Sequence, residues 1–247
     1  MAQAFFIWNN IDCRSMGITK RGFSPIIRPE ERVQHVEIPG KSGDLTETEG
    51  DNIYNSYIQT ATISAKAGMR VREIYKWMRG SGYVTFDSEP DRRQRARIIG
   101  AVTLEKLSRN LDKYVGEVQF YCQPLKEKLH EEKVMVTASG STVMNTGDVK
   151  CRPLYKVTVS GSGTGKSISL TVSGNGTPES NTIAVTGLTG GDVIWIDSDA
   201  VEVMTGDRTA LLTANSAGHF PVMAPGANTV TGSGWSSIEI ERRERFL

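Results

Sequence analysis

The sequence has few of the residue types that build metal centres, disulfide frameworks or membrane spans. Its 247 residues include three cysteines and three histidines, and the cysteines lie far apart with no C-x-x-C pair. An odd, dispersed set of cysteines favours reduced thiols over a disulfide framework or a zinc cluster. No apolar run approaches the ~20 residues of a transmembrane helix. We therefore expect no metal, no cofactor and no membrane partner.

An excess of charge of one sign is also missing. The 29 Lys and Arg residues nearly balance the 28 Asp and Glu residues, so the net charge is +1. A protein that binds polyanions in general usually carries a basic excess or a basic stripe. The balance therefore argues against general binding of nucleic acid.

The composition changes near residue 130. Residues 1–130 carry 20 basic and 16 acidic side chains, whereas residues 131–247 carry 9 and 12 and hold 15 of the 25 glycines. A break of this kind predicts two domains, 1–130 and 131–247. The segment KEKLHEEK at 126–133 has no apolar face and is predicted to be a charged, solvated connector.

The first part is predicted to be α+β. Alternating or β-branched segments predict strands at 5–8, 32–38, 54–66, 83–86, 96–107 and 113–122. The polar, glycine-broken segment 40–52 is predicted to be a loop. Val71, Ile74, Tyr75 and Met78 have the i, i+3, i+4, i+7 spacing of an amphipathic helix over 69–79, which we expect to pack on the sheet through these four side chains.

The second part shows no helical period. Short apolar segments separated by Gly, Asn, Pro and Asp predict strands at 134–137, 154–159, 168–172, 182–185, 193–196, 201–204, 210–212, 228–231 and 237–240. Many short strands with glycine turns are typical of a β-sandwich. The predicted fold class of the whole chain is therefore mainly β.

No motif in the chain satisfies the requirements of a catalytic or nucleotide site. GSGTGKS at 161–167 is one residue short of a phosphate-binding loop and lies between two predicted strands, so it is interpreted as a hairpin turn. Asp197, Asp199 and Glu202 lack the spacing of a calcium loop and are interpreted as turn residues. No histidine accompanies a serine or cysteine nucleophile in a known motif. We expect no enzymatic activity.

Several segments, taken in order, carry a family resemblance. They are FFIWNNIDCRSMGI, VEIPGKSGDL, IYKWMRGSGYVTF, FDSEPDRRQRARI, VQFYCQPL, CRPLYKVTVSGSG, VIWIDSD, GHFPVMAPGANTVTGSG and IEIERRERFL. Their order resembles the distal tail (Dit) protein family of long-tailed bacteriophages over nearly the whole chain. The resemblance implies an N-terminal belt domain and a C-terminal galectin-like β-sandwich.

The resemblance also implies a structural function in the virion. It implies a homo-hexameric ring at the phage tail tip, made in the host cytoplasm. This ring would connect the tail tube protein to the tail-associated hub protein and the receptor-binding baseplate proteins. DNA would pass through the ring without specific binding.

Charged residues of the first part are the candidates for the subunit interface of such a ring. The arginine run could pair with acids of a neighbouring copy. The candidate residues are Lys41, Asp44, Glu47, Arg92, Arg93, Arg95 and Arg97.

The alternative is a carbohydrate-binding module that attaches the particle to a cell-wall glycan. A sugar-binding galectin needs a His, Asn and Arg cluster with a stacking Trp. His219 has no such cluster around it in the sequence, and Trp195 and Trp235 are interpreted as core residues. The resemblance therefore implies the galectin-like fold without lectin activity.

Overall fold

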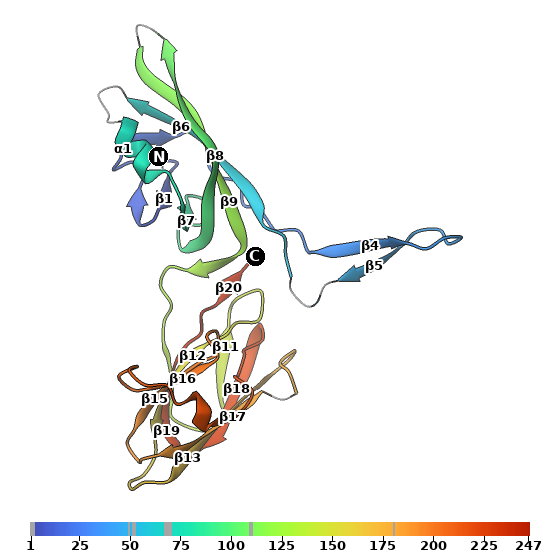
Figure 1. Cartoon of the computed structure of the whole chain (residues 1–247), viewed down its shortest axis with the longest axis vertical. Helices are drawn as coiled ribbons and strands as arrows, with labels where there is room; N and C mark the ends of the chain where they lie inside the picture. Colours follow the sequence, from blue (N-terminus) through green and yellow to red (C-terminus); the bar gives the residue numbers. More distant parts are fainter. Residues whose placement is uncertain (1–2, 49, 51–52, 67–70, 109–110, 180) are drawn as a thin grey trace. The chain divides into compact units, whose positions relative to one another are not determined.

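The chain forms two compact units in the computed structural model, which describes residues 3–48, 50, 53–66, 71–108, 111–179 and 181–247 (Figure 1). The first unit comprises Met1–Leu129 with Leu247, and the second comprises His130–Phe246. Strands dominate both units, so the prediction of a mainly β protein is confirmed.

The first unit is built on one antiparallel sheet with the strand order β2-β1-β7-β8-β9-β6-β3. The strands are β1 (Phe6–Trp8), β2 (Ile11–Asp12), β3 (Ile18–Lys20), β6 (Tyr57–Lys66), β7 (Ser81–Phe86), β8 (Arg92–Ser108) and β9 (Leu111–Lys128). One face of this sheet buries Phe6, Trp8, Ile63 and Phe120. The alternation of side chains leaves the opposite face of β6, β8 and β9 exposed.

The helix α1 (Val71–Trp77) packs on the buried face. Residues 69 and 70 of the predicted helix lie outside the described residues. Ile74 and Met78 are buried as expected, but Tyr75 is 39% exposed, so its assignment to the packing face was wrong. Trp77 makes that contact instead. The indole Nε1 of Trp77 donates to the Trp8 carbonyl at 3.2 Å, and the indole of Trp8 donates to the Trp77 carbonyl at 3.1 Å.

Strands β8 and β9 form a hairpin longer than the sequence pattern predicted. Strand β9 continues past Pro124 because the register slips there: Ala96 pairs with Cys122, whereas Gln94 pairs with Lys126. Such a bulge accommodates Pro124, because proline has no backbone N–H to donate to the neighbouring strand. The prediction of a solvated connector over 126–133 is therefore wrong for residues 126–128, which belong to β9, whereas His130, Glu132 and Lys133 are exposed. Lys126 is 3% exposed, and its ammonium donates to the Glu89 carboxylate at 2.6 Å.

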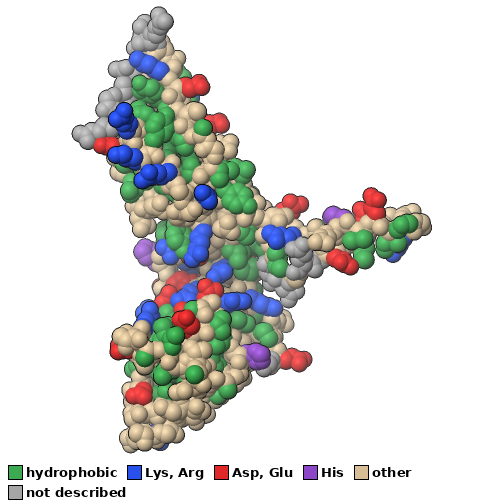
Figure 2. Space-filling model, viewed as in Figure 1, with side chains coloured by type: hydrophobic (Ala, Val, Ile, Leu, Met, Phe, Trp, Pro, Cys, Tyr) green, Lys and Arg blue, Asp and Glu red, His purple; other side chains and the backbone are tan. Residues whose placement is uncertain are grey.

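A separate two-stranded sheet joins the strand predicted at 32–38 to part of the segment that was predicted to be a loop. Strand β4 (Val33–Glu37) pairs with β5 (Asp44–Thr48) in antiparallel register (Figure 1). The prediction of a loop over 40–52 was wrong for β5, because its polar side chains are tolerated on a strand that is exposed to solvent. Figure 2 shows hydrophobic and acidic side chains together at the surface of this hairpin.

The second unit is a sandwich of two antiparallel five-stranded sheets with the orders β10-β19-β12-β15-β16 and β11-β18-β13-β14-β17. Side chains from both sheets, including Tyr155, Leu170 and Ile238, form one buried core. The strands are β10 (Val134–Val136), β11 (Ser141–Asn145), β12 (Leu154–Val159), β13 (Lys166–Gly174), β14 (Thr182–Leu188), β15 (Val193–Asp197), β16 (Glu202–Thr205), β17 (Ser216–Gly218), β18 (Gly226–Ser233), β19 (Trp235–Glu241) and the terminal β20 (Arg245–Phe246), with a 3-10 turn at Thr213–Asn215.

The glycine-rich segment 161–165 joins the two layers of the sandwich. Strands β12 and β13 belong to different sheets, so the interpretation of GSGTGKS as a hairpin turn was wrong. Gly161, Gly163 and Gly165 all have positive φ, between 72° and 84°. Because glycine adopts this conformation without steric cost, the chain can change direction three times within five residues and enter the other sheet.

Candidate assembly surfaces

The arginines of β8 divide into two groups. Arg92 and Arg93 pair with acids of their own chain: Arg92 lies 3.0 Å from the Glu89 carboxylate, and Arg93 lies 3.5 Å from the Glu127 carboxylate. Arg95 donates to the Tyr83 hydroxyl at 3.1 Å and stays exposed. Arg97 is exposed as well. Among the candidate arginines, Arg95 and Arg97 therefore present the most accessible guanidinium groups.

Arg97 belongs to a row of side chains across the exposed face of the sheet. It lies opposite Tyr121 of β9, which in turn lies opposite Ile58 of β6. Tyr121 is 41% exposed and Ile58 is 51% exposed. Directly opposed residues on antiparallel strands place their side chains on the same face, about 5 Å apart. The three side chains therefore form a basic and apolar row on the solvent-exposed face of the sheet.

The hairpin β4–β5 carries the other group of candidate residues. Asp44 lies opposite Glu37, and Glu47 lies opposite Gln34, while Lys41 is in the turn and its backbone N–H donates to the Ile38 carbonyl at 3.1 Å. All of these side chains are exposed. The tertiary fold thus places the two candidate groups on different elements of the first unit, the hairpin and the exposed sheet face.

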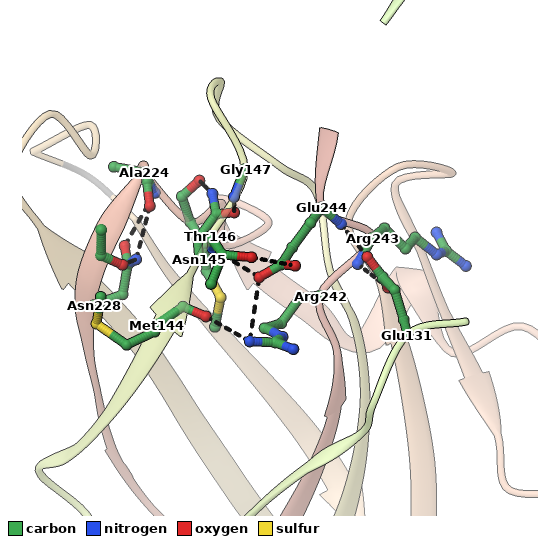
Figure 3. Close-up of polar contacts among 12 residues, drawn as sticks. Glu131, Met144, Asn145, Thr146, Gly147, Ala224, Asn228, Arg242, Arg243 and Glu244 are labelled. Carbon is green, nitrogen blue, oxygen red and sulfur yellow. Dashed lines mark hydrogen bonds and ion pairs between the residues drawn. The ribbon is translucent and has the colours of Figure 1, made fainter. Parts of the chain in front are cut away.

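The second unit contains a buried polar network near its final segment (Figure 3). The fully buried Glu244 carboxylate accepts hydrogen bonds from the Thr146 backbone N–H at 2.7 Å and from the Thr146 hydroxyl at 2.8 Å. Arg242 lies 3.2 Å from the same carboxylate and donates to the Met144 carbonyl at 2.8 Å. The Glu131 carboxylate accepts from the backbone N–H groups of Arg243 and Glu244. These bonds attach the first and last residues of the unit to each other.

Two buried asparagines hold the neighbouring loops. The Asn228 side chain accepts from the Ala224 backbone N–H at 3.0 Å and donates to the Ala224 carbonyl at 2.8 Å (Figure 3). The Asn145 side chain accepts from the Gly147 backbone N–H at 2.9 Å. Each side-chain amide pairs with backbone groups that the strands leave without a partner. We therefore assign these two asparagines a structural role in holding the loops.

The acidic turn after β15 is neutralised by arginines of the final segment. Asp197 pairs with Arg243 at 2.8 Å, and Asp199 lies 3.4 Å from Arg245. Burial opposes ionisation of Asp197, but the bonds from Arg243 and from the Ala200 backbone hold the pKa of its carboxyl below the ordinary value. Across the described residues there is no group of three or more His, Cys, Asp or Glu side chains that could hold a metal ion.

The cysteines are buried free thiols. Burial raises the pKa of both Cys122 and Cys151 to about 12 and raises that of Cys13 as well. A thiol that stays protonated is a poor nucleophile and a poor metal ligand. None of the described helical segments has the length and hydropathy needed to cross a bilayer.

The two tryptophans of the second unit lie in different environments. Trp235 packs against the core of the sandwich, in agreement with its interpretation as a core residue. The interpretation of Trp195 as core was wrong: it alternates with the buried Ile194 and Ile196, so its ring lies on the outer face of the sheet. The Arg208 guanidinium lies 3.8 Å from the centroid of this ring.

The fold was compared with those of known proteins, and the similar structures are phage hub and baseplate proteins. No protein-family model matches the sequence, and no curated protein matches it. The fold is that of phage baseplate hub proteins. It resembles the Dit protein of phage SPP1, with a TM-score of 0.77, 17% sequence identity and complete coverage of both chains.

Chains of the phage P2 baseplate in its activated conformation, with calcium and with strontium, resemble it more distantly. Each has a TM-score of 0.52 over the full length of both chains, at 9% and 8% identity. The resemblance to the distal tail family that the sequence suggested is thus confirmed at the level of the fold.

Proposed function

We propose that this chain is a structural subunit of a long-tailed phage, located at the tail tip, where six copies form a closed ring. The observation that carries the proposal is the full-length likeness to the SPP1 Dit protein, which is described as a paradigm of the hub adsorption apparatus in phages that infect Gram-positive bacteria. The likeness includes both units, so it supports a hub subunit with a belt domain and a galectin-like domain.

In this role the ring connects the tail tube protein to the tail-associated hub protein and to the receptor-binding proteins of the baseplate. DNA passes through the ring without specific binding. The near-neutral net charge of +1 supports this, because a strongly basic channel would retain the phosphate backbone. The role requires no catalysis by this chain.

Exposed apolar side chains on the first unit support its assignment as the ring-forming part. Ile58 and Tyr121 on the sheet, and Val36, Ile38 and Leu45 on the hairpin, are between 38% and 51% exposed. Ile58 and Tyr121 are direct neighbours, as are Val36 and Leu45, and neighbouring apolar side chains at the surface can mark an interaction site. We therefore propose that subunit contacts use this unit.

Native mass spectrometry tests the ring directly. The expected assembly has a mass of about 163 kDa, which is six times 27.1 kDa. Negative-stain images at high protein concentration are expected to show six-fold rings, and an antibody to the chain is expected to label the tail tip. The ring is expected to weaken with salt, since exposed charge pairs are screened. A monomer at every concentration, with no label at the tail tip, contradicts the proposal.

One observation favours the alternative, a carbohydrate-binding module. The outward-facing ring of Trp195 has Lys156 and Met204 as direct neighbours across β12, β15 and β16, and such a row can in principle stack a sugar. Arg208 already occupies one position over this ring. Glycan binding that is lost in Trp195→Ala and strengthened in Arg208→Ala would support this function. Both variants keep Trp235, which packs against the core. Absence of binding to cell-wall glycans leaves the structural role.

A further inference from the structure

We propose that the apolar face of the β4–β5 hairpin packs on the row Arg97, Tyr121 and Ile58 of a second copy of this chain. The inference rests on the proposed ring and names the two surfaces that meet. It selects Glu47 and Arg97 from the candidate interface residues and leaves Asp44 outside the contact.

The register of the hairpin divides its side chains into two unlike faces. Val36 lies opposite Leu45, and Gln34 lies opposite Glu47, so these four side chains share one face with Ile38. His35, Thr46, Glu37 and Asp44 lie on the other face. One face, the apolar face, therefore carries three apolar side chains with Gln34 and Glu47 at one end. The other, the polar face, is polar except for Val33 at its far end from the turn.

The apolar face of the hairpin is only partly covered by the described residues of its own chain. Val36 is 43% exposed, Leu45 is 44% exposed and Ile38 is 38% exposed. In the part of the chain that the structure describes, β4 and β5 pair only with each other. A lone two-stranded hairpin is marginal in water and needs a third strand or a packing surface. The sequence nevertheless places three of the hairpin's apolar side chains, Val36, Ile38 and Leu45, on one side, which is the pattern of a surface that becomes buried on assembly.

The exposed face of the sheet has the complementary order of side chains. Along the hairpin the order is Glu47, then Val36 with Leu45, then Ile38. Across the sheet the order is Arg97, then Tyr121, then Ile58. From strand geometry the two rows are roughly 13 Å and roughly 10 Å long. The long, flexible side chains of Arg97 and Glu47 can bridge the difference between the two rows.

A second copy is the occupant that these surfaces indicate. Both surfaces remain exposed on the same chain, so they do not cover each other within one subunit. Their charges are opposite, since Glu47 meets Arg97. Because the two patches differ, the contact is heterologous: each subunit offers its hairpin to one neighbour and its sheet to the other. A contact of this type forms a ring when the rotation between subunits closes.

Charge reversal tests the contact. Glu47→Lys and Arg97→Glu are each expected to weaken subunit association about tenfold, and the two changes together are expected to restore it. Asp44→Lys is the matched control, because it changes the charge by the same amount on the same strand but on the polar face. Association is read by sedimentation velocity. A double variant weaker than either single variant, or an Asp44→Lys variant as weak as Glu47→Lys, overturns the proposed contact.

Cross-linking tests proximity without relying on charge. A mixture of Leu45→Cys and Tyr121→Cys chains is expected to form covalent dimers with a short bismaleimide, whereas Thr46→Cys mixed with Tyr121→Cys is expected to form few. The parent protein controls for its three buried cysteines. Absence of a Leu45–Tyr121 cross-link at the highest soluble concentration overturns the contact. A six-fold ring that forms without this cross-link contradicts the contact and leaves the proposed function intact. Absence of any ring on the virion contradicts the proposed function itself.

Discussion

Arg243 donates hydrogen bonds to both carboxylate oxygens of Asp197, at 2.8 and 3.1 Å. The pair attaches the final segment of the chain to the end of β15, and the Asp197 carboxylate also accepts from the backbone N–H of Asp199 and of Ala200. The sequence alone identified Asp197 only as a residue of a turn between two strands. In the structure, its pair with Arg243 holds the end of the second unit in place. Arg243 lies 46 residues away from Asp197 in the chain.

Removal of this arginine is expected to destabilise the second unit. Arg243→Met leaves a largely buried carboxylate without its partner, at an expected cost of about 1–3 kcal/mol after allowance for partial exposure. Arg245→Met is the control, because its pair with Asp199 is more exposed and longer, at 3.4 Å. Its expected cost is below about 1 kcal/mol. Denaturant unfolding of the two variants provides the measurement, and equal losses would contradict the structural role of Arg243.

The buried pair between Lys20 and Asp87 is expected to couple two distant segments of the first unit. Both side chains are 2% exposed, and their charged atoms lie 3.2 Å apart. Lys20→Met alone is expected to cost about 3–5 kcal/mol, because Asp87 is left buried and ionised. Lys20→Met combined with Asp87→Leu is expected to cost less than the sum of the two single changes. Additive losses in this double-mutant cycle would show that the pair is not coupled.

The same aspartate predicts a pH dependence. Burial of Asp87 opposes ionisation, but the bonds from Ser24 and Lys20 outweigh it and lower the pKa of the carboxyl below the ordinary 3.8. A lowered folded pKa means that the unfolded chain binds the proton first as the pH falls. The contribution of ionised Asp87 to the stability of the first unit is therefore fully present above pH ~4 to 5. It declines as the pH falls through the pKa of Asp87 in the folded protein. Asp87→Asn is expected to flatten this decline in the melting temperature of the first unit, and an unchanged profile would contradict the assignment.

The packing of α1 depends on Ile74. Ile74→Asp places a charge at a position that is 1% exposed and is expected to destabilise the first unit by several kcal/mol, on the order of 3–5. Tyr75→Asp changes the adjacent, 39% exposed position and is expected to cost less than about 1 kcal/mol. Thermal melts of both variants distinguish the two faces of the helix. If the two variants melt together, the helix packs through another face.

The segment GSGTGKS is expected to bind no nucleotide. Its glycines connect strands of two different sheets, and Lys166 begins β13 rather than a helix. A phosphate-binding loop needs a following helix N-terminus to hold the anion. Calorimetry with ATP and magnesium is expected to show no saturable heat. Saturable binding that disappears in Lys166→Ala would require a different interpretation of this segment.

Much of the strand content followed from local pattern. Alternation at 154–159 and at 168–172 predicted β12 and most of β13, because the side chains of a strand with one buried face must alternate. The spacing of Val71, Ile74 and Met78 predicted α1 for the same kind of reason. By contrast, β5 was missed, since Leu45 is its one apolar residue and a single apolar residue gives no alternation that distinguishes a strand from a loop.

Pairings between distant residues were decided by the tertiary structure alone. The sequence by itself determined that the two parts of the chain differ in composition and that the chain is mainly β. It also determined that arginines gather at 92–97. It did not determine that Arg92 and Arg93 pair with acids of their own chain, while Arg97 lies in a row with Tyr121 and Ile58. The register of three strands sets that row, and register depends on the bulge opposite Arg95 and on the core beneath the sheet. Local periodicity specifies which face a residue occupies, but only the packed sheet specifies which residues become its neighbours.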